Sequence, residues 1–396
     1  MATLNANAVT SWNQNKYAKV VSALLFTKSV AMGLANTELR ANMPDGTVIT
    51  RPTTSFLGIQ QYSANNEATY SDLSLGSETL TINDTPMVAF TLDQIDDDNA
   101  GWNISMNTME NVARLLREYV DGKFFAQVLN FTNTTGTTVA LSSSNAYSTM
   151  SSAIAGLINA GIDDTKIRLV VDAFGIDKIG QNAVSSVFSL ADKTYTSGYV
   201  GREVAGGQLV RSENLTMVGT FNMGGATPVD GNIVKINGYT FTFKTTLAGV
   251  PGQVLIGASA TTAAGNLTAA INGTTAGTSH VAVLASDRNK FLRGLSAVNA
   301  TTLTTFTSTR GYRGAGAFSK TVSDPLNKFG QFVIYYTAFE EGAINMVMRD
   351  SVKSVSGRLP KSLVTEFLTW SRFGLKVFAD GAERGIIIPV EARAAE

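Results

Sequence analysis

Four acidic residues stand close together in the sequence and have the oxygen donors to bind a hard cation. They are Asp93, Asp96, Asp97 and Asp98, and carboxylate oxygens are the ligands that Ca²⁺ and Mg²⁺ prefer. Their spacing lacks the alternating acidic or amide positions, the glycine and the later glutamate of a calcium-binding EF-hand loop. A helix that begins just after the cluster explains it without a metal, because a helix N-terminus attracts carboxylates. We therefore expect no metal site.

Histidine and cysteine chemistry is almost excluded by composition. His280 is the only histidine among 396 residues, and there is no cysteine. One histidine cannot form an HExxH or other multi-histidine metal site, and no G-x-S-x-G elbow supports a Ser-His-Asp arrangement. Without cysteine there are no disulfides, thiolate nucleophiles or cysteine–zinc sites. We expect His280 to be a satisfied residue of a strand.

Two further groups of residues have simple structural explanations. Glycines that superficially resemble a nucleotide-binding loop occur at Gly198, Gly201, Gly206 and Gly207. They lack both the P-loop sequence and the GxGxxG order after a strand, so a flexible turn is the better interpretation. Glu340 and Glu341 have the chemistry of a paired acid and base, but an exposed helix face explains adjacent glutamates equally well. We therefore predict no catalytic or cofactor-binding residue, no cofactor and no enzymatic activity.

Two groups of basic residues have the chemistry to contact phosphates. The first group is interspersed with Tyr312 and Phe318 and consists of Arg310, Arg313, Lys320 and Lys328. The second group consists of Lys353, Arg358 and Lys361. The chain has 31 basic and 31 acidic residues, so no overall positive field attracts nucleic acid. Solvated residues or salt bridges between subunits explain each basic residue more simply.

The chain is long and apolar enough to fold into two or three domains. Hydrophobic residues make up 44% of it, which permits a sizeable core. Glycine is frequent, with 36 residues, whereas there are only 8 prolines, and Ser, Thr and Asn are plentiful. This composition is typical of a protein with many strands and turns.

An apolar run near the N-terminus mimics a signal peptide. It extends from Val20 to Ala35, follows Lys16 and Lys19, and ends in small residues. A long polar stretch precedes it and Lys28 interrupts it, so we favour a helix that packs on a partner over a secretion signal. No apolar run reaches the roughly 18 residues of a membrane span, so we expect no membrane partner.

The most informative stretch is an extended arm followed by a long helix. Residues 47–81 alternate polar and β-branched side chains, Pro52 indicates a sheet edge, and a strand is expected over Met87–Ile95. From Asn103 to Leu129 an apolar stripe at helical spacing predicts one helix, about 40 Å long at 1.5 Å per residue. An arm without a core of its own needs an external surface to lie on, which indicates assembly rather than catalysis.

The rest of the chain alternates helices and strands. Helices are expected over 147–160, 174–181 and 260–271, and strands over 167–172, 208–215, 232–244, 253–257, 280–286 and 302–309. Asn237-Gly238 predicts a tight hairpin within 232–244. We also expect a hairpin over 131–144, a strand that passes into a helix over 331–348, and a closing hairpin over 372–392 that turns at Asp380-Gly381. Residues 219–309, almost free of acidic side chains, have the composition of a separate β-rich domain.

The order of these elements resembles that of the tailed-phage major capsid proteins with the Hong Kong 97-like fold. Three segments are similar in sequence to family members: SETLTINDTPMVAFTLDQIDDDNA before the long helix, IRLVVDAFGIDKI, and the closing RFGLKVFADGAERGIIIPVEA. The resemblance covers residues 5–218 and 325–396. It implies an α+β fold with an N-terminal arm, an extended loop (the E-loop), a peripheral domain with a long spine helix, and an axial domain, here with an inserted β-rich domain.

This resemblance divides the chain into six parts. They are 1–45, the N-terminal arm and helix; 46–82, the E-loop; 83–130, the peripheral strand and spine helix; 131–218, the axial domain; 219–309, the inserted β-rich domain; and 310–396, the rest of the axial and peripheral domains with the C-terminal hairpin. The inserted domain is expected either as an exposed decoration or as a brace within a capsomer.

The implied function is that of a major capsid protein. Such a protein self-assembles into hexamers and pentamers of an icosahedral shell that encloses double-stranded DNA, and it belongs to the virion, assembled in the host bacterial cytoplasm. The implied partners are other copies, reached by the E-loop, with a separate scaffolding protein, the portal, decoration or cement proteins, and packaged DNA held by sparse, non-specific contacts. A tail-tube or decoration protein is the alternative within the virion, and a secreted adhesin the alternative outside it.

One departure from the family concerns covalent crosslinking. Some members link their shells through a lysine of the E-loop. Here no lysine occurs between Lys28 and Lys123, so we expect the E-loop to stabilise a shell by non-covalent overlap.

Overall fold

The computed structural model describes most of the chain, in two compact units. The described residues are 19–25, 29–39, 47–54, 75–93, 104–186, 203–223, 227–274, 277–308, 332–358 and 364–391. The first unit takes its residues from 1–28, 34–116 and 344–378, and the second from 29–33, 117–343 and 379–396.

The first unit is built on a three-stranded antiparallel sheet and a two-stranded hairpin. The sheet has the order β15-β16-β3, with β15 at Ile344–Arg358, β16 at Val364–Val377 and β3 at Met87–Asp93; the hairpin pairs β1 (Val48–Thr54) with β2 (Leu75–Thr81). One face of the sheet holds Phe90 stacked on Phe367, with ring centroids 5.0 Å apart, whereas Met87 on the other face is 70% exposed. The alternation expected for a half-buried strand over Met87–Ile95 is therefore confirmed in β3.

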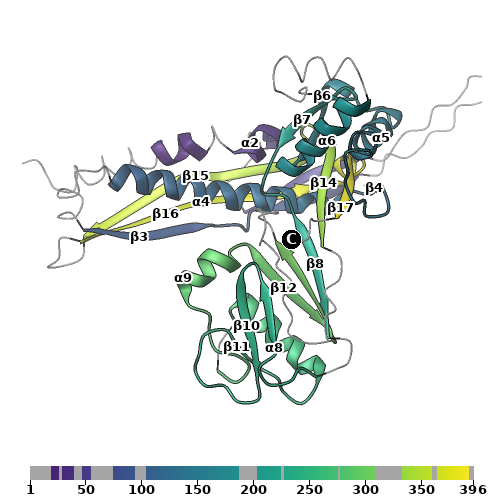
Figure 1. Ribbon diagram of the computed structural model, residues 1–396. Coiled ribbons are helices and arrows are strands. Elements are labelled where there is room, and N and C mark those ends of the chain that lie inside the picture. Colours follow the sequence, from purple (N-terminus) through teal and green to yellow (C-terminus); the bar gives the residue numbers. More distant parts are fainter. Residues whose placement is uncertain are drawn as a thin grey trace, which may run out of the picture. The chain divides into compact units, whose positions relative to one another are not determined.

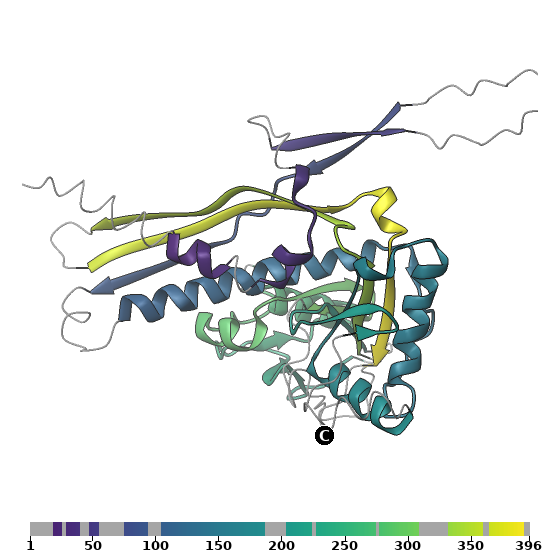
Figure 2. The same ribbon diagram turned by 90° about the horizontal axis from the view of Figure 1, so that it is seen from above.

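Helix α4 (Ile104–Ala126) is the long helix that the sequence predicts. Figures 1 and 2 show its first part running beside the three-stranded sheet. It continues as a short 3-10 helix over Gln127–Asn130, so the predicted range of Asn103–Leu129 is confirmed within a residue at each end. Val112, Leu116 and Val120, which recur every four residues, are buried, as expected of an amphipathic helix.

The second unit is built on a nine-stranded mixed sheet. Its main path is β12-β13-β8-β14-β5-β7-β6, and β17 with β4 lies beside β14. The bounds are β4 Asn133–Thr134, β5 Ile167–Val171, β6 Glu203–Val204, β7 Gly207–Arg211, β8 Met217–Asn222, β12 Leu295–Ala300, β13 Leu303–Ser308, β14 Val333–Glu340 and β17 Gly385–Glu391. Helices α5 (Ala146–Asn159) and α6 (Ala173–Ser186) pack against each other and on β5.

A buried carboxylate fixes the start of α6 in this unit. The Oδ1 atom of Asp172 accepts a hydrogen bond from the Gly175 backbone N–H (2.7 Å) and another from the Tyr336 hydroxyl on β14. A side chain at Gly175 would come within 2.9 Å of the Tyr336 ring. This part of the segment IRLVVDAFGIDKI therefore has a structural explanation: the aspartate caps the helix, and the glycine leaves room for the tyrosine.

A small lobe, residues 227–292, lies within the second unit (Figure 1). It contains a three-stranded sheet, β9 (Ile233–Ile236), β10 (Tyr239–Lys244) and β11 (Gln253–Leu255), with helix α8 (Ala260–Asn272), followed by α9 (Ala285–Asp287) and a π-helix at Arg288–Leu292. The hairpin turning at Asn237-Gly238 is confirmed, since Ile236 pairs with Tyr239. Helix α8 packs on β11 and also on β12 and β13; its buried alanines permit this close approach on two sides.

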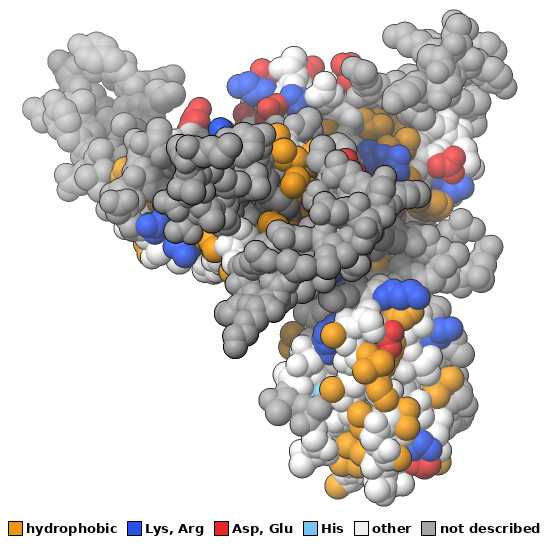
Figure 3. Space-filling view, turned by 90° about the vertical axis from the view of Figure 1, so that its left-hand side faces the viewer, with side chains coloured by type: hydrophobic (Ala, Val, Ile, Leu, Met, Phe, Trp, Pro, Cys, Tyr) orange, Lys and Arg blue, Asp and Glu red, His pale blue; other side chains and the backbone are white. Residues whose placement is uncertain are grey.

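Strand β12 lies at the end of the nine-stranded path, and a side chain of the lobe covers part of its edge. The Asn272 side chain donates to the Ala297 carbonyl (2.8 Å) and accepts from the Ala297 N–H (2.8 Å). It occupies the hydrogen-bonding groups that another strand would use, and so blocks strand addition at this point. Figure 3 shows that the lobe presents mainly uncharged and hydrophobic side chains on the face in view.

The structure contradicts four predicted elements. Strand β17 pairs with β14 rather than β16, so the closing segment is not a hairpin, and a short helix, α10 (Ala379–Ala382), occupies the predicted turn. The segment after β14 is strand β15, not a helix. Residues 280–286 form one isolated bridge and part of α9, and residues 131–144 contain only β4 and a bridge. The pairing observed for these segments depends on residues far away in the sequence, which a local pattern does not reveal.

The remaining helices and strands agree better with expectation. Helices α5, α6 and α8 and strands β5, β7, β11 and β13 occupy the predicted segments with shifted ends. Near the N-terminus the predicted helix over Val20–Ala35 is present as two helical pieces, residues 19–25 and α2 (Val30–Leu34).

Candidate assembly surface

The hairpin β1–β2 has two chemically different faces. Its register runs from Val48 opposite Thr81 to Thr54 opposite Leu75. Because opposite residues in an antiparallel pair share a face, the residues separate into an inner and an outer set. The inner face carries Ile49, Arg51, Glu78 and Leu80, and the outer face carries Val48, Thr50, Pro52, Ser77, Thr79 and Thr81. Figure 2 shows the pair as a narrow ribbon at one side of the three-stranded sheet.

The inner face is anchored to the end of the three-stranded sheet by a small apolar core. Ile49 and Leu80 pack with three residues from other segments of this unit, Ile82, Val347 and Phe378. All five are buried, and Phe378 has no exposed surface. A two-stranded hairpin is only marginally stable by itself, so this core fixes the base of the hairpin in its own subunit.

Two cations reinforce the anchor on one aromatic ring. The Arg51 guanidinium lies 4.3 Å and the Lys376 ammonium 5.3 Å from the centroid of the Phe378 ring. Lys376 also donates a hydrogen bond to the Thr79 carbonyl (2.7 Å), and Arg51 lies 3.6 Å from Glu78. Each cation–π contact at a partly exposed site contributes on the order of 1 kcal/mol.

The outer face is an uncharged ladder. Its six residues are exposed, none is ionisable, and three rungs are formed by opposite pairs: Val48 with Thr81, Thr50 with Thr79, and Pro52 with Ser77. Threonine methyls and β-branched side chains form a flat, partly apolar surface that is dehydrated at low cost. Pro52 has no N–H, so it limits strand addition along the free edge of β1. The hairpin is therefore suited to contact through its outer face rather than through a continuous edge ladder.

A close crossing at Gly374 positions the segment that leaves the hairpin. A Cβ at Gly374 would lie 2.5 Å from the Thr81 carbonyl oxygen, so only glycine fits where this segment crosses β16. Beyond the crossing, Asp84 and Phe373 exchange backbone hydrogen bonds of 3.1 and 3.0 Å. The chain is thus held on β16 between the hairpin and β3.

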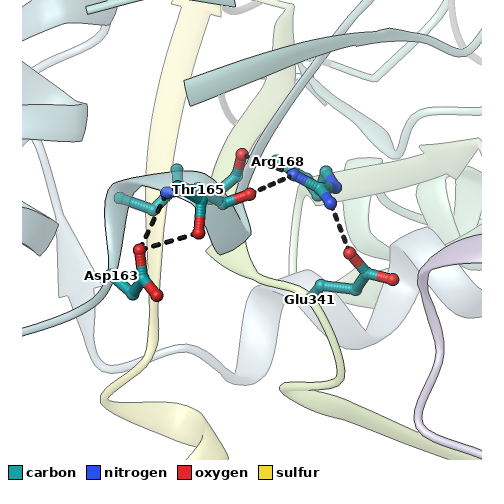
Figure 4. A network of polar contacts seen from close by, with 5 residues as sticks. Asp163, Thr165, Arg168 and Glu341 are labelled. Carbon is teal, nitrogen blue, oxygen red and sulfur yellow. Dashed lines mark hydrogen bonds and ion pairs between the residues drawn. The ribbon is translucent and has the colours of Figure 1, made fainter. Parts of the chain in front are cut away.

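The two adjacent glutamates do not form an acid–base pair. Glu340 lies at the end of β14 and bonds Arg384 (3.1 Å), while Glu341 in the following turn bonds Arg168 (2.5 Å). Figure 4 shows the second pair within a network in which Arg168 also donates to the Thr165 carbonyl and Thr165 donates to Asp163. The prediction of an exposed helix face was wrong, since Glu340 is the last residue of strand β14 and Glu341 lies in the turn after it. Their separate arginines give each carboxylate a structural role.

The other residues considered for chemistry are not brought together as a site. His280 is buried beside β11, and its Nδ1 atom lies 2.9 Å from the Ser279 hydroxyl. Burial, with a smaller effect of Arg288, lowers the pKa of His280, so the imidazole is neutral at pH 7. Gly206 lies in the tight turn between β6 and β7 with φ +92°, and Gly207 is the first residue of β7.

Several predicted positions lie outside the described residues. They include Gly198 and Gly201, three of the four clustered aspartates (Asp96, Asp97 and Asp98), residues 55–74 of the segment expected to be the E-loop, and the basic residues Arg310, Arg313, Lys320, Lys328 and Lys361. Lys353, which is described, pairs with Asp350 of the same chain at 2.6 Å, so the expectation of salt bridges between subunits is not tested by this contact.

The described ranges contain neither a membrane-spanning helix nor a cluster of metal-binding side chains. In those ranges no helix has both the length and the apolar character needed to cross a membrane. Among the same residues, no three histidine or acidic side chains gather in the way that metal ligands do.

Solved phage structures are similar to the chain over most of its length. One from Mycobacterium phage Che8 has a TM-score of 0.53 at 12% identity, and covers 91% of this chain and 90% of its own. The capsid structure of the cyanophage P-SCSP1u has a TM-score of 0.49 at 10% identity, covering 92% and 88%. The mature capsid of bacteriophage PhiM1 has 0.49 at 8% identity, covering 92% and 87%. No protein-family model and no curated protein matches the sequence.

The fold follows from the likeness to the Che8 structure. The chain has the Hong Kong 97-like capsid fold, with mixed helix and sheet, as the sequence resemblance implied. The hairpin β1–β2 occupies the place in the chain order that the resemblance gives to the base of the E-loop.

Proposed function

We propose that the protein is the major capsid protein of a tailed phage. It forms hexamers and pentamers of an icosahedral shell around double-stranded DNA, and belongs to the virion after assembly in the host bacterial cytoplasm. The fold supports this proposal. The observation that carries it is the hairpin whose inner face is anchored in its own subunit while its uncharged outer face is exposed.

The outer face is the part of the hairpin that contacts a neighbouring copy. A surface without ionisable groups is buried against another subunit with little desolvation cost, and shape then determines where it fits. The same contact repeated from copy to copy is heterologous, and it closes into rings when the rotation between copies permits. No lysine lies between Lys28 and Lys123, so the overlap is non-covalent.

Contact with the packaged genome is sparse in this proposal. With 31 basic and 31 acidic residues, the subunit has no net charge with which to hold DNA. Lys353 is already paired with Asp350. Contacts with DNA are therefore few and directed at the phosphate backbone. A scaffolding protein, a portal and decoration proteins are the separate partners that such a shell requires.

Assembly of the full chain tests the proposal. The protein is expressed alone and with its neighbouring genes, and the products are examined by negative-stain electron microscopy and sedimentation velocity. Uniform shells, or rings of five and six subunits, are the expected products. A protein that stays monomeric at high concentration in both expressions contradicts the proposal, and long tubes indicate a tail-tube protein instead.

A deletion separates a role in assembly from a role in folding. The variant lacking residues 55–74 keeps β1, β2 and the whole apolar core at their base. We expect it to retain the circular dichroism and thermal transition of the full chain but to form no stable shells. Loss of the folded state in this variant would mean that the segment belongs to a core of its own subunit.

A further inference from the structure

The outer edge of β11 in the small lobe is covered by a short segment of chain, residues 279–281, which we name the edge cover. β11 is the last strand in the order β11-β10-β9, and the edge cover lies along its other side. The Leu255 N–H donates to the Ser279 carbonyl at 2.8 Å. The Val281 N–H donates to the Gln253 carbonyl, also at 2.8 Å. Without the edge cover, these backbone groups of β11 would be open to strand addition.

The side chain at the centre of the edge cover is buried. His280 is 1% exposed, and its backbone forms an antiparallel bridge with Val254 on β11. The Nδ1 atom of the imidazole lies 2.9 Å from the Ser279 hydroxyl oxygen. The Gly277 N–H donates to the His280 carbonyl at 3.1 Å, which closes the turn before the edge cover. Because the hydrogen bonds to β11 flank His280 on both sides, the edge cover leaves β11 only if the imidazole leaves its buried position.

The described residues around His280 offer no acidic side chain to offset a positive charge on the ring. Helix α8, strand β11 and residues 277–284 contain no charged side chain. The π-helix contributes Arg288, which donates to two carbonyl groups in the last turn of α8, each at 2.9 Å, and is thereby held in place. Asp287 precedes Arg288 but does not act on His280, and the charged residue of β10, Lys244, is also positive.

These surroundings keep the buried imidazole neutral. Burial is the main cause that lowers the pKa of His280 from its ordinary value of 6.5, Arg288 lowers it further, and a weaker effect of the Thr274 backbone opposes both. An imidazole released into solvent takes up a proton as the pH falls below 6.5, whereas the buried imidazole does so only at lower pH. The buried position is therefore fully stable above pH 6.5, and its stability is lost as the pH falls from 6.5 through the lower pKa of the buried ring.

We infer that the edge cover is a pH-dependent closure of the small lobe, which stays on β11 while His280 is neutral and leaves β11 when His280 is protonated. Release exposes the outward backbone groups of Gln253 and Leu255. Mildly acidic solution thus converts a closed sheet edge into one that can accept another strand. The closure lies entirely within the lobe, so it requires neither a shell nor a second copy of the chain.

Hydrogen exchange of the full chain at about pH 7.5 and about pH 5 tests the release. The amides of Leu255 and Val281 report on it directly, because they donate the hydrogen bonds between β11 and the edge cover. After correction for the intrinsic rate of each amide, we expect both to exchange faster at the lower pH. The increase should be up to about thirtyfold, the limit for a buried ring that stays neutral about 1.5 pH units below 6.5. Equal protection at both pH values overturns the inference, as does an equal increase in the hairpin β9–β10 of the same lobe.

Two variants separate the charge of the imidazole from its packing. His280→Gln keeps a polar side chain that takes up no proton, so the exchange of Leu255 and Val281 should no longer depend on pH. Ser279→Ala is the matched control, since it removes the hydroxyl beside Nδ1 but leaves the ring that titrates. Its pH dependence should remain. A pH dependence that persists in His280→Gln, or that disappears in Ser279→Ala, contradicts a role for the buried charge.

A titration of the unaltered protein applies even if a variant fails to fold. His280 is the only histidine among the 396 residues, so the Cε1–H signal of its imidazole in the NMR spectrum of the unassembled chain needs no assignment. We expect the midpoint of its titration to lie below 6.5. A midpoint at or above 6.5 overturns the inference. Because none of these measurements needs shells, a failure of the edge cover is distinguishable from a failure of the proposed capsid function.

Discussion

Arg293 donates a hydrogen bond to the carboxylate of Glu118, 175 residues away in the sequence. Glu118 lies on α4 and its side chain is 6% exposed, while Arg293 follows the last helical turn of the small lobe. Asp121, which accepts hydrogen bonds from Ser29 and Ala31, lies three residues further along the same helix. The polar face of α4 is therefore buried over this part by two segments that are distant in sequence, each matched to one carboxylate.

Replacing Arg293 by Gln should destabilise the second unit strongly. The change removes the Arg293 charge from the buried Glu118 carboxylate, and breaking a buried ion pair typically costs about 3–5 kcal/mol; because Arg293 is partly exposed, we expect about 3 kcal/mol. Urea denaturation measures the free energy of unfolding. The double variant with Glu118→Gln should recover most of the loss, since a neutral amide pair carries no unpaired charge. If the double variant is no more stable than Arg293→Gln alone, the ion pair is not the cause.

A charge on the outer face of the hairpin should prevent assembly without unfolding the subunit. Thr79→Glu places a carboxylate on the central rung, where contact with a second copy would desolvate it without a partner at a cost of several kcal/mol. We expect the concentration needed for assembly, measured by light scattering, to rise at least about tenfold. Thr240→Glu, at an exposed strand position of the lobe, is the control. The outer face is not a contact surface if both variants assemble alike.

Truncating Phe378 should loosen the base of the hairpin. Phe378→Ala removes the ring on which Arg51 and Lys376 lie and leaves a cavity in the apolar core, for an expected loss of about 3–5 kcal/mol in the first unit. Phe378→Leu fills most of the space and should cost less. Hydrogen exchange in β1 and β2 gives the local readout, and unchanged protection there would contradict the anchor.

A methyl group at Gly374 should be far more damaging than one at another strand glycine. Gly374→Ala brings a Cβ to 2.5 Å from the backbone carbonyl of Thr81, which cannot turn away as a side chain can. We expect a loss of about 1–3 kcal/mol or more from the backbone shift. Gly357→Ala on β15 is the control, because nothing lies within 4 Å of its Cβ position. Equal melting temperatures of the two variants would show that the crossing adapts.

The pH dependence of stability should report on Asp172. Burial is the main cause that raises the pKa of its carboxyl above the ordinary value of 3.8, against the opposing hydrogen bonds from Tyr336 and Gly175. Because the pKa of Asp172 is higher in the folded protein than in the unfolded chain, the unfolded chain releases the Asp172 proton at a lower pH than the folded protein does. Stability is therefore lost between pH 3.8 and the raised folded pKa.

Asp172→Asn removes this titration but keeps an acceptor oxygen for Tyr336 and Gly175. Relative to the unaltered protein, the variant should gain stability as the pH rises through that window, and the difference should be flat above it. Urea denaturation of both proteins from pH 3.5 to 7 measures the difference, in which the contributions of other groups cancel. A difference that does not change with pH would contradict the raised pKa.

Local sequence patterns predicted the elements of this protein well where neighbours along the chain decide the structure. The apolar stripe containing Val112 and Leu116 predicted helix α4, and Asn237-Gly238 predicted the hairpin β9–β10. The alternation in residues 47–81 predicted an extended arm, and the described parts of it form the strands β1 and β2. Composition excluded cysteine and multi-histidine chemistry outright. The resemblance to capsid proteins implied the fold that the comparison with solved structures shows.

Tertiary structure alone decided which segments meet. Strand β17 pairs with β14 and not with the adjacent β16, because pairing depends on burial and register over the whole sheet rather than on a nearby turn. The contact of Arg51 with Phe378 and the hydrogen bond from Ser29 to Asp121 join residues whose separation in sequence leaves no local signal. From the sequence alone we expect the arm to have no core of its own and to need a surface outside itself, whereas the structure buries the inner face of β1–β2 in an apolar core of the first unit. Only the folded structure decided which face of the arm remains exposed, because the residues that bury the other face come mainly from the C-terminal part of the chain.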